Sequence, residues 1–438
     1  MKTVGIIAEY NPFHNGHAYH MEQAKKMTGA DTCVVVMSGD FVQRGAPAVL
    51  DKYVRAETAL RCGADLVLEL PACFSCGSAE YFAQGAVSVL NRLGVVDALC
   101  FGSESADLTT LQALARILSR EPEAFTDSLQ KSLREGKNFA AARSDALIAC
   151  MMQEQIHLSA IQNIYILTDA MSSPNNILGI EYLKALLTQN SSIKPYVLKR
   201  AGQEYHSKEI EGHMNSASAL RSLLETTREL SILKESVPPE VYRLLEQEYG
   251  KIYPVSSEDF SLMLNYCLLS ESDPSRFGDM TPDMAARIFN ERGAFRSFSG
   301  WTDLLNTKQY TRTRVSRSLM QCLLKITRRD LAEYKASGYT GYARILGFKK
   351  ERTDLLRAIK EQGRIPLISK MADAKEFLQP IWQRQLEQDV HAADLYRLAV
   401  YTRFGTELPN EYRRQLVILN RNMETETEGD DGLGKKDI

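Results

Sequence analysis

The sequence predicts an α/β fold, in which a doubly wound parallel sheet is followed by an all-helical C-terminal domain. In the first hundred residues, short apolar runs without polar alternation alternate along the chain with segments of helical periodicity. Such runs are typical of parallel strands covered on both faces. Beyond about residue 225 the chain shows helical periodicity only. The strand–helix rhythm of the first part predicts right-handed crossovers within one sheet.

The predicted strands cover residues 3–8, 32–37, 65–70, 95–101 and 193–198. Helices are expected at 18–27, 51–61 and 78–93, because a glycine follows each pattern where a left-handed helix cap would lie. The segment from 108 to about 187 is also helical in pattern, and a further helix opens at Ser216 or Ser218.

Three regions follow from this pattern: a catalytic domain at 1–225, a helical domain at 226–420 and an acidic, flexible tail at 421–438. The tail is rich in carboxylates and poor in apolar residues, which is typical of solvated segments. Helices of the second domain are expected at 239–248, 260–269, 280–291, 315–333, 352–362, 373–378 and 391–403.

Composition excludes several classes of protein. The chain has 438 residues, a formal net charge of −2, 44% hydrophobic and 25% charged residues, which excludes global disorder and collagen-like repeats. The N-terminal apolar stretch is too short for a signal peptide or a membrane span, so we expect a cytoplasmic protein without membrane attachment. Nothing in the sequence indicates a stable protein partner. The eight cysteines are expected to be reduced and to pack in the interior.

Three of the seven histidines, His14, His17 and His20, follow the first predicted strand within seven residues. The turn there should face the crevice at the carboxyl ends of the strands, where ligands bind in such sheets. Gly16 allows a close backbone approach, and the following helix start should offer free N–H groups to a phosphate.

Three interpretations of this cluster remain open. The histidines could bind a metal, although their spacing lacks the usual i, i+4 pattern and no nearby acid or cysteine completes a set. They could also cap or pack against the helix locally. Phosphate binding is favoured, since it alone uses the strand, the glycine, the helix start and the imidazoles together.

The motif His14-x-Gly16-His17 after a first strand resembles the signature of the nucleotidyltransferase superfamily, which has a HUP-type, Rossmann-like sheet. Longer strings extend the likeness: residues 9–17 (EYNPFHNGH), 38–45 (SGDFVQRG), 101–104 (FGSE), 174–182 (PNNILGIEY) and 343–348 (ARILGF). Together they resemble the bacterial tRNA(Met) cytidine acetate ligase family. The resemblance covers essentially all of the chain except the acidic tail.

This resemblance implies a ligase that uses ATP to activate acetate as acetyl-adenylate, with release of pyrophosphate. The acetyl group then passes to the wobble cytidine of elongator tRNA(Met), which becomes N4-acetylcytidine. Mg²⁺ is expected to accompany the nucleotide, although no acidic motif identifies its ligands. Two alternatives stay open: a nucleotidyltransferase that acts on a small molecule without RNA, and a catalytically silent RNA-binding protein.

By the same resemblance, His14 and His17 are the catalytic residues, and Lys199, Ser218 and Arg221 are further candidates for phosphate contact. Asp40, Gln43 and Arg44 follow the second strand and could line the same crevice. The residues implied in ATP binding are Ile7, Ala8, Glu9, Tyr10, Asn11, Pro12, Phe13, His14, Asn15, Gly16, His17, His20, Gly102, Asn176 and Arg200.

Residues 301–350 are strongly basic, with eleven Lys and Arg against three acids and a net charge of +8. The aromatic residues interleaved with them, such as Trp301, Tyr334 and Tyr342, could stack on unpaired bases. The stretch is therefore a candidate tRNA interface. Its predicted contacts, with one from the second-strand loop, are Arg44, Arg312, Arg314, Arg317, Arg328, Arg329, Lys349 and Lys350.

Overall fold

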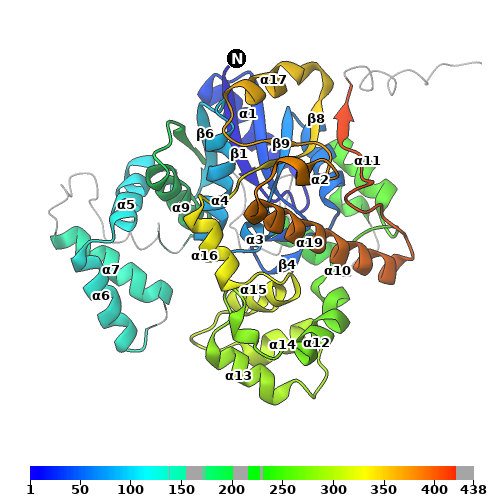
Figure 1. The fold of residues 1–438 in the computed structure, drawn as a ribbon. Coiled ribbons are helices and arrows are strands. Elements are labelled where there is room, and N and C mark those ends of the chain that lie inside the picture. The colour runs from blue at the N-terminus through cyan, green and yellow to red at the C-terminus, as the bar shows by residue number, and fades with distance from the viewer. Residues whose placement is uncertain (138, 154–170, 172, 201–215, 227–229, 421–438) are drawn as a thin grey trace, which may run out of the picture.

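A computed structural model describes residues 1–137, 139–153, 171, 173–200, 216–226 and 230–420. A single main sheet lies at its centre, with the strand order β10–β8–β5–β2–β1–β6–β7 and β9 paired to β8 (Figure 1). The acidic tail at 421–438 lies outside the described residues. The strands are β1 (Thr3–Ala8), β2 (Thr32–Ser38), β5 (Leu66–Leu70), β6 (Ala98–Ser103), β7 (Lys194–Lys199), β8 (Ala343–Lys349), β9 (Leu367–Ile368) and β10 (Val417–Leu419).

The five strands from β5 to β7 are all parallel, which confirms the doubly wound sheet. Every residue of β2 and of β5 is buried, as continuous apolar runs predict for strands covered on both faces. The order reverses between β1 and β6. In such sheets the crevice for a ligand opens at this switch point, outside the carboxyl ends of the strands.

Helices cover both faces of the sheet. On one face, α1 (Asn15–Thr28) packs on β1, β6 and β7, and α2 (Lys52–Arg61) packs on β5, β8 and β10. On the other face, α4 (Ala79–Arg92) packs on β2 and β5, and α9 (Pro174–Thr188) packs on α4 and β6. Between α1 and α2, the chain forms the hairpin of β3 (Phe41–Val42) and β4 (Ala46–Pro47).

Two groups of helices lie away from the sheet. Helices α6 and α7 lie side by side and project to one side, while α12 to α15 form a lobe below the carboxyl ends of the strands (Figure 1). The α-helices not yet given are α3 (Ala72–Ser75), α5 (Leu108–Arg120), α6 (Glu123–Arg134), α7 (Phe139–Gln153), α10 (Ala217–Thr226), α11 (Pro239–Glu248), α12 (Ser261–Ser270), α13 (Pro282–Glu291), α14 (Phe298–Leu305), α15 (Arg312–Leu323), α16 (Arg328–Ala336), α17 (Thr353–Gln362), α18 (Ala374–Phe377) and α19 (Pro380–Phe404).

The C-terminal region is mainly helical, as predicted, but the expectation that it contains no strands is wrong. Strand β8 pairs antiparallel with β5, and β9 and β10 pair parallel with β8. The signal in Ala343–Lys349 is weak because a glycine interrupts the apolar run and charged residues flank it. The division at residue 225 stays a prediction, although strands from both sides of it share the sheet.

One predicted helix, 315–333, is two helices in the structure. Helix α15 ends at Leu323, and Lys325 has a left-handed φ of 54° before Thr327 caps α16. The Thr327 hydroxyl accepts from the Asp330 amide, which satisfies a donor that the break exposes. The break changes the direction of the chain within the basic stretch.

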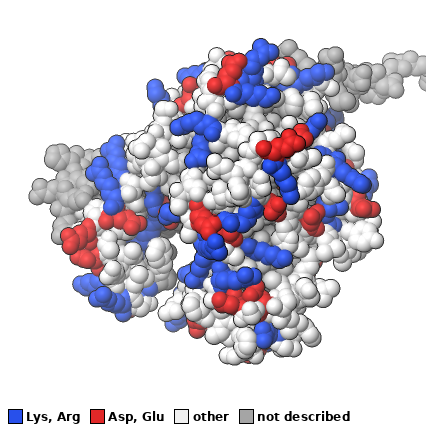
Figure 2. All heavy atoms as spheres, viewed as in Figure 1, with Lys and Arg blue, Asp and Glu red and all other residues white. Residues whose placement is uncertain are grey.

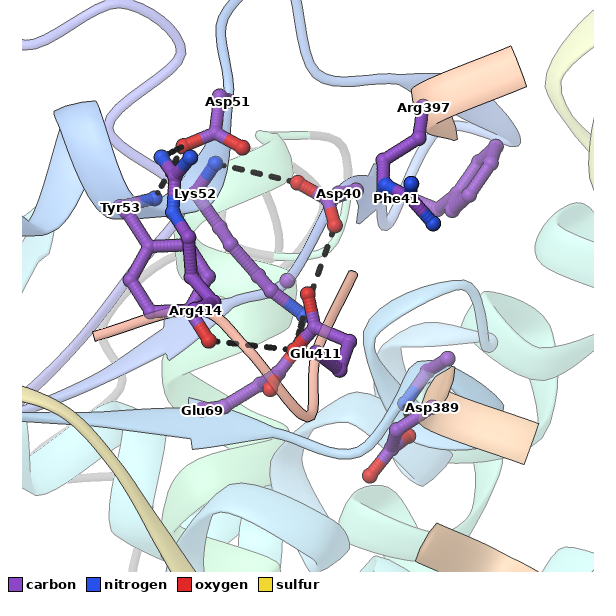
Figure 3. A network of polar contacts seen from close by, with 12 residues as sticks. Asp40, Phe41, Asp51, Lys52, Tyr53, Glu69, Asp389, Arg397, Glu411 and Arg414 are labelled. Atoms are coloured by element: carbon purple, nitrogen blue, oxygen red, sulfur yellow. Dashed lines mark hydrogen bonds and ion pairs between the residues drawn. The ribbon is translucent and has the colours of Figure 1, made fainter. Parts of the chain in front are cut away.

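Buried ion pairs join the C-terminal segment to the sheet (Figure 3). Lys52 Nζ lies 2.8 Å from Glu69 Oε1, 3.2 Å from Glu411 Oε2 and 3.5 Å from Asp40 Oδ2. Arg344 pairs with both Glu69 and Glu411, and all five side chains are less than 5% exposed. Because each charge has an opposite charge beside it, this burial is tolerated.

Within the described ranges, no helix combines the length and apolar character that crossing a bilayer requires.

Candidate active site

A cavity of about 210 Å³ opens at the carboxyl ends of β1, β6 and β7, next to the switch point of the sheet. The β1–α1 turn, the β3–β4 hairpin, α9 and the start of α10 complete its walls. The following predicted site residues line it: Ile7, Ala8, Glu9, Tyr10, Asn11, His14, Gly16, His17, His20, Arg44, Gly102, Lys199, Arg200, Ser218 and Arg221.

His14 is the N-cap of α1 and forms a reciprocal pair with His17. Its Nδ1 accepts from the Gly16 amide at 3.1 Å, and His17 Nδ1 accepts from the His14 amide at 3.2 Å. The two rings stack with centroids 3.7 Å apart. Since both Nδ1 atoms accept hydrogen bonds, each neutral ring carries its proton on Nε2 and can donate from that atom.

Burial keeps these imidazoles neutral near pH 7. It lowers the pKa of His14 to about 3, and the nearby positive charges of Arg200 and Arg221 act in the same direction. Burial also lowers the pKa of His17 well below its usual value, with His14 adding to the effect. His14 and His17 are therefore neutral hydrogen-bond donors in this structure and do not act as cations.

The expectation of free amides at the start of α1 is wrong. The Asn15 amide donates to the Ser236 carbonyl at 3.0 Å, the Gly16 amide to His14 Nδ1 and the His17 amide to the His14 carbonyl at 2.8 Å. Gly16 is required here because an added Cβ would lie 2.9 Å from the His14 ring. Local capping and a role in anion binding are thus compatible for the same histidines.

The cavity has a strong excess of positive charge. Arg44, Lys199, Arg200 and Arg221 line it, and Glu9 is the one carboxylate among the described residues that do so. Such a concentration of cations in a partly buried site favours a polyanion, because the surrounding protein screens their field poorly.

Helix α10 contributes Arg221 to this positive charge. Ser216 caps the helix by accepting from the Ala219 amide at 3.1 Å. Arg221, one turn further along the helix, donates to the Asn11 carbonyl at 2.7 Å and to the Ser218 hydroxyl at 3.0 Å. The arginine therefore contacts the β1–α1 turn while its guanidinium lines the cavity.

On the opposite wall, Gly102 leaves room for Arg200, since an added Cβ would lie 3.3 Å from Arg200 Cγ. Arg200 donates to Asn175 Oδ1 at 3.3 Å. Asn176 does not line the cavity: it is fully buried, and its Oδ1 accepts from Ser103 Oγ at 2.6 Å and the Glu104 amide at 3.0 Å. Its neighbour Asn175 lines the cavity instead.

Three further predicted residues lie behind the cavity wall. Phe13 is 1% exposed and packs on Tyr10, Pro12 is buried, and Asn15 donates through its side chain to the Glu235 carbonyl. Asp40 also turns away from the cavity, because it belongs to the buried ion pairs with Lys52. Gln43, from the same loop, does line the cavity.

Sequence reasoning did not find the apolar wall of the cavity. Phe101 and Leu198 end neighbouring strands, so the rule that ligands meet carboxyl ends of strands could have indicated them. Phe82 comes from α4, and no motif marks it; Leu178 and Tyr182 come from α9 and lie within the string 174–182, which did not identify them as lining residues. The lining residues missed in this way are Tyr19, Phe82, Phe101, Asn175, Leu178, Tyr182, Leu198, Ser216 and Ala217.

Among the described residues, no group of three or more His, Cys, Asp or Glu side chains is placed to hold a metal ion. The Nδ1 atoms of His14 and His17 already accept backbone hydrogen bonds. The structure thus gives the metal interpretation of the cluster no support.

Three of the six aromatic residues of the basic stretch are not exposed for stacking, whereas Tyr310, Tyr339 and Phe348 are partly exposed. Trp301, Tyr334 and Tyr342 are at most 1% exposed and belong to the hydrophobic core. Arg344, from the same stretch, is buried among carboxylates. Large aromatic rings stabilise a core strongly, and here that role outweighs exposure to a ligand.

The predicted tRNA contacts divide into separate groups in space. Arg44 lines the cavity, and the hairpin that carries it contacts α15 through a hydrogen bond of 2.7 Å from Ser316 Oγ to the Gly45 carbonyl. Lys349 ends β8 beside the first residues of β5, at the opposite end of the parallel strands from the cavity, and Lys350 follows it.

Most of the remaining basic candidates have acidic or carbonyl partners. Arg312 pairs with Asp303, Arg317 with Asp279 at 2.7 Å and Arg329 with Glu333 at 2.7 Å. Arg328 donates to the carbonyls of Gly278 and Met280, and Arg314 lies over the Tyr310 ring. Figure 2 shows basic side chains gathered around α15 and α16, with acidic ones among them.

Comparisons with known proteins agree with this geometry. The model of the HIGH Nucleotidyl Transferase family matches residues 1–408. A tRNA(Met) cytidine acetate ligase from Acetivibrio thermocellus is 39% identical over 96% of this chain and 100% of its own length. The tRNA(Met) cytidine acetate ligase of Alkaliphilus metalliredigens is 37% identical over 91% of this chain and 95% of its own length.

Solved structures extend the likeness to the whole fold. The crystal structure of apo Thermotoga maritima TmcAL has a TM-score of 0.90 and 29% identity, and covers 96% of this chain and 100% of its own. The same enzyme bound with alpha-thio ATP has a TM-score of 0.87 and 30% identity at the same coverage. The chain therefore belongs to the HIGH nucleotidyltransferase family, among the tRNA(Met) cytidine acetate ligases.

Proposed function

We propose that this protein uses ATP to activate acetate as acetyl-adenylate and transfers the acetyl group to the wobble cytidine of elongator tRNA(Met). The observation that carries the proposal is the cavity at the sheet switch point, where four cations and two imidazole donors surround space for a polyanion. The names of the relatives supply the acyl group and the tRNA. The proposed setting is the cytoplasm.

The first step needs a carboxylate oxygen of acetate to attack the α-phosphorus of ATP while negative charge moves to the departing pyrophosphate. Catalysis of this kind depends on positioning and on donors fixed in advance, without a covalent nucleophile. The Nε2–H groups of His14 and His17 are such donors, since hydrogen bonds to the backbone fix both rings. Arg200 and Arg221 line the same cavity and would balance the charge of the triphosphate.

Mg²⁺ bound with the nucleotide is a further part of the proposal. Glu9 is the sole carboxylate among the described lining residues, and its Oε1 already accepts from the Gln43 amide at 2.9 Å. The side chains present therefore do not form a site for a resident metal ion. Any Mg²⁺ would arrive bound mainly to phosphate oxygens and water.

For tRNA, the exposed part of the basic stretch next to the cavity is the proposed interface. Arg44 is on the cavity rim, and α15, with Arg312 and Arg314 in its first turn, packs against the hairpin of Arg44. Exposed ion pairs such as Arg312–Asp303 contribute little stability, so a phosphate can replace the carboxylate at small cost. An anticodon-loop base can leave its stack more easily than a base in a duplex.

The test is incubation with ATP and labelled acetate, with and without total tRNA, followed by nucleoside analysis of the RNA. Label in N4-acetylcytidine, with pyrophosphate release that depends on acetate, is the expected result. Cleavage of ATP without any label in tRNA would instead support a nucleotidyltransferase that acts on a small molecule.

A further inference from the structure

Glu9 is the exception to the positive charge of the cavity. Among the described residues that line it, Glu9 alone is acidic, whereas Arg44, Lys199, Arg200 and Arg221 are basic. A carboxylate repels the phosphates that the cations attract. Burial lowers the pKa of Arg44, and the charge of Glu9 acts in the opposite direction, so Glu9 balances part of the positive charge on this wall.

Hydrogen bonds on both sides hold Glu9 in position. Its carbonyl accepts from Arg55 Nη1 at 2.7 Å, and its Oε1 accepts from the Gln43 amide at 2.9 Å. Arg55 is fully buried and also donates to the Ser38 carbonyl at 3.0 Å, which joins the ends of β1 and β2. The Glu9 carboxylate is thus fixed beside the β3–β4 hairpin, on the wall that α15 supports.

The imidazoles of His14 and His17 are unsuited to accepting a proton from a substrate. The Nδ1 atoms of His14 and His17 accept backbone N–H groups, so their Nε2 atoms carry hydrogen. A carboxylate, by contrast, has two oxygens with about four acceptor positions, and the Gln43 amide occupies one. Carboxylates also accept hydrogen bonds from the exocyclic amine of cytosine in nucleic-acid recognition.

We propose that Glu9 is a catalytic residue of acetyl transfer: it accepts a hydrogen bond from the N4 amine of the acceptor cytidine and takes the proton that this amine loses. This proposal rests on the proposed function. N4 attacks the carbonyl carbon of acetyl-adenylate, and a C–N bond forms. The bond between that carbon and the phosphate oxygen breaks, and AMP leaves with the electron pair. Of the two protons on N4, one stays on the amide nitrogen of the product, and the other goes to the Glu9 carboxylate and then to water.

Two assays on the full chain separate the steps: acetate-dependent exchange of pyrophosphate into ATP, and transfer from prepared acetyl-adenylate to tRNA. For Glu9→Gln, the transfer rate should fall by a factor of about a hundred or more, the size typical of general base catalysis. The factor by which the transfer rate falls should be at least about ten times the factor by which the rate of pyrophosphate exchange falls. The KM for ATP should not rise, because the substitution removes a negative charge from a polyanion site.

Glu104→Gln is the matched control, since Glu104 contacts Asn175 beside the cavity but does not line it. In Glu104→Gln, the rate of acetyl transfer divided by the rate of pyrophosphate exchange should equal the wild-type ratio. Glu9→Asp, which keeps the carboxylate, should recover part of the transfer rate.

Three outcomes for Glu9→Gln would overturn the proposal. Equal slowing of both steps would make Glu9 a positioning residue, and exchange restored by added Mg²⁺ would make it a metal ligand. Unchanged transfer would leave the departing phosphate as the proton acceptor. Wild-type protein that transfers no acetyl group from acetyl-adenylate to tRNA would instead refute the proposed function itself.

Discussion

The rings of His14 and His17 stack with centroids 3.7 Å apart, and the Nδ1 atom of each accepts a hydrogen bond from a backbone amide at the start of α1, that of Gly16 and that of the N-cap His14. The same pair therefore begins the helix and presents two Nε2–H donors at the cavity. Substitutions can separate these two roles, because asparagine also caps helices well but lacks the imidazole Nε2–H.

His17→Ala should slow acetate-dependent pyrophosphate exchange by about a hundredfold to a thousandfold, the typical effect of losing one fixed donor at a transition state. His14→Asn should slow exchange similarly while it keeps the cap of α1. His14→Ala should also lower the free energy of unfolding by about 1 kcal/mol, since the cap is lost. Exchange at the wild-type rate in His17→Ala would contradict the assignment.

The depressed pKa of His14 predicts a specific pH dependence of stability. In the unfolded chain His14 takes up a proton near pH 6.5, whereas in the fold its pKa is about 3. Stability from this group is therefore present above pH 6.5 and is lost as the pH falls toward 3. Between pH 7 and pH 5, wild-type protein should lose about 2 kcal/mol more than His14→Asn in urea unfolding. Parallel curves for the two proteins would contradict the prediction.

Asn176 and Asn175 are neighbours with different predicted roles. Asn176→Ala should lower the free energy of unfolding by about 2–4 kcal/mol, because the buried Ser103 hydroxyl and Glu104 amide lose their acceptor. Asn175→Ala should affect stability less and raise the KM for ATP, since Asn175 contacts Arg200 at the cavity. Chemical denaturation and exchange kinetics measure the two effects, and a reversed pattern would reject the assignment.

The basic residues near α15 should contribute to tRNA affinity. Arg314→Ala should raise the KM for tRNA about tenfold, the scale of one charge-assisted hydrogen bond, and weaken its salt dependence. The double substitution of Lys349 and Lys350 should have a smaller effect, because Lys349 lies at the amino end of β5, away from the cavity at the carboxyl ends of the parallel strands. A larger effect from the lysines would place the tRNA interface at that end of the sheet.

Lys52 should be essential for folding stability. Lys52→Met leaves the carboxylates of Asp40, Glu69 and Glu411 without their shared cation, so we expect a loss of about 3–5 kcal/mol in the free energy of unfolding. Glu57→Gln, which removes the more exposed Arg61 pair on the same helix, should cost less than about 1 kcal/mol. Similar losses in the two variants would contradict this reading of the buried ion pairs.

The parallel part of the sheet was predictable because its signals are local. The strands predicted at 3–8 and 32–37 agree with β1 and β2, and the glycine after the first helix, Gly29, has the left-handed φ of 64° that ends it. Motif positions on the β1–α1 turn were predictable for the same reason, since eleven successive residues fold into one turn and helix start. The role of Asn176 was not predictable, because its partner Glu104 lies in the loop after β6, far away in the sequence.

The sequence by itself determined the order of strands and helices in the first domain, the histidine turn at the first strand and the likeness to a ligase family. Only the tertiary structure decided that Ala343–Lys349 joins the sheet, that Arg344 and Trp301 are buried and that Glu9 stands among four cations. Periodicity records which face of an element is apolar, but it does not record which distant segment covers that face. Burial and charge pairing depend on such contacts, so they appear only when the whole chain has folded.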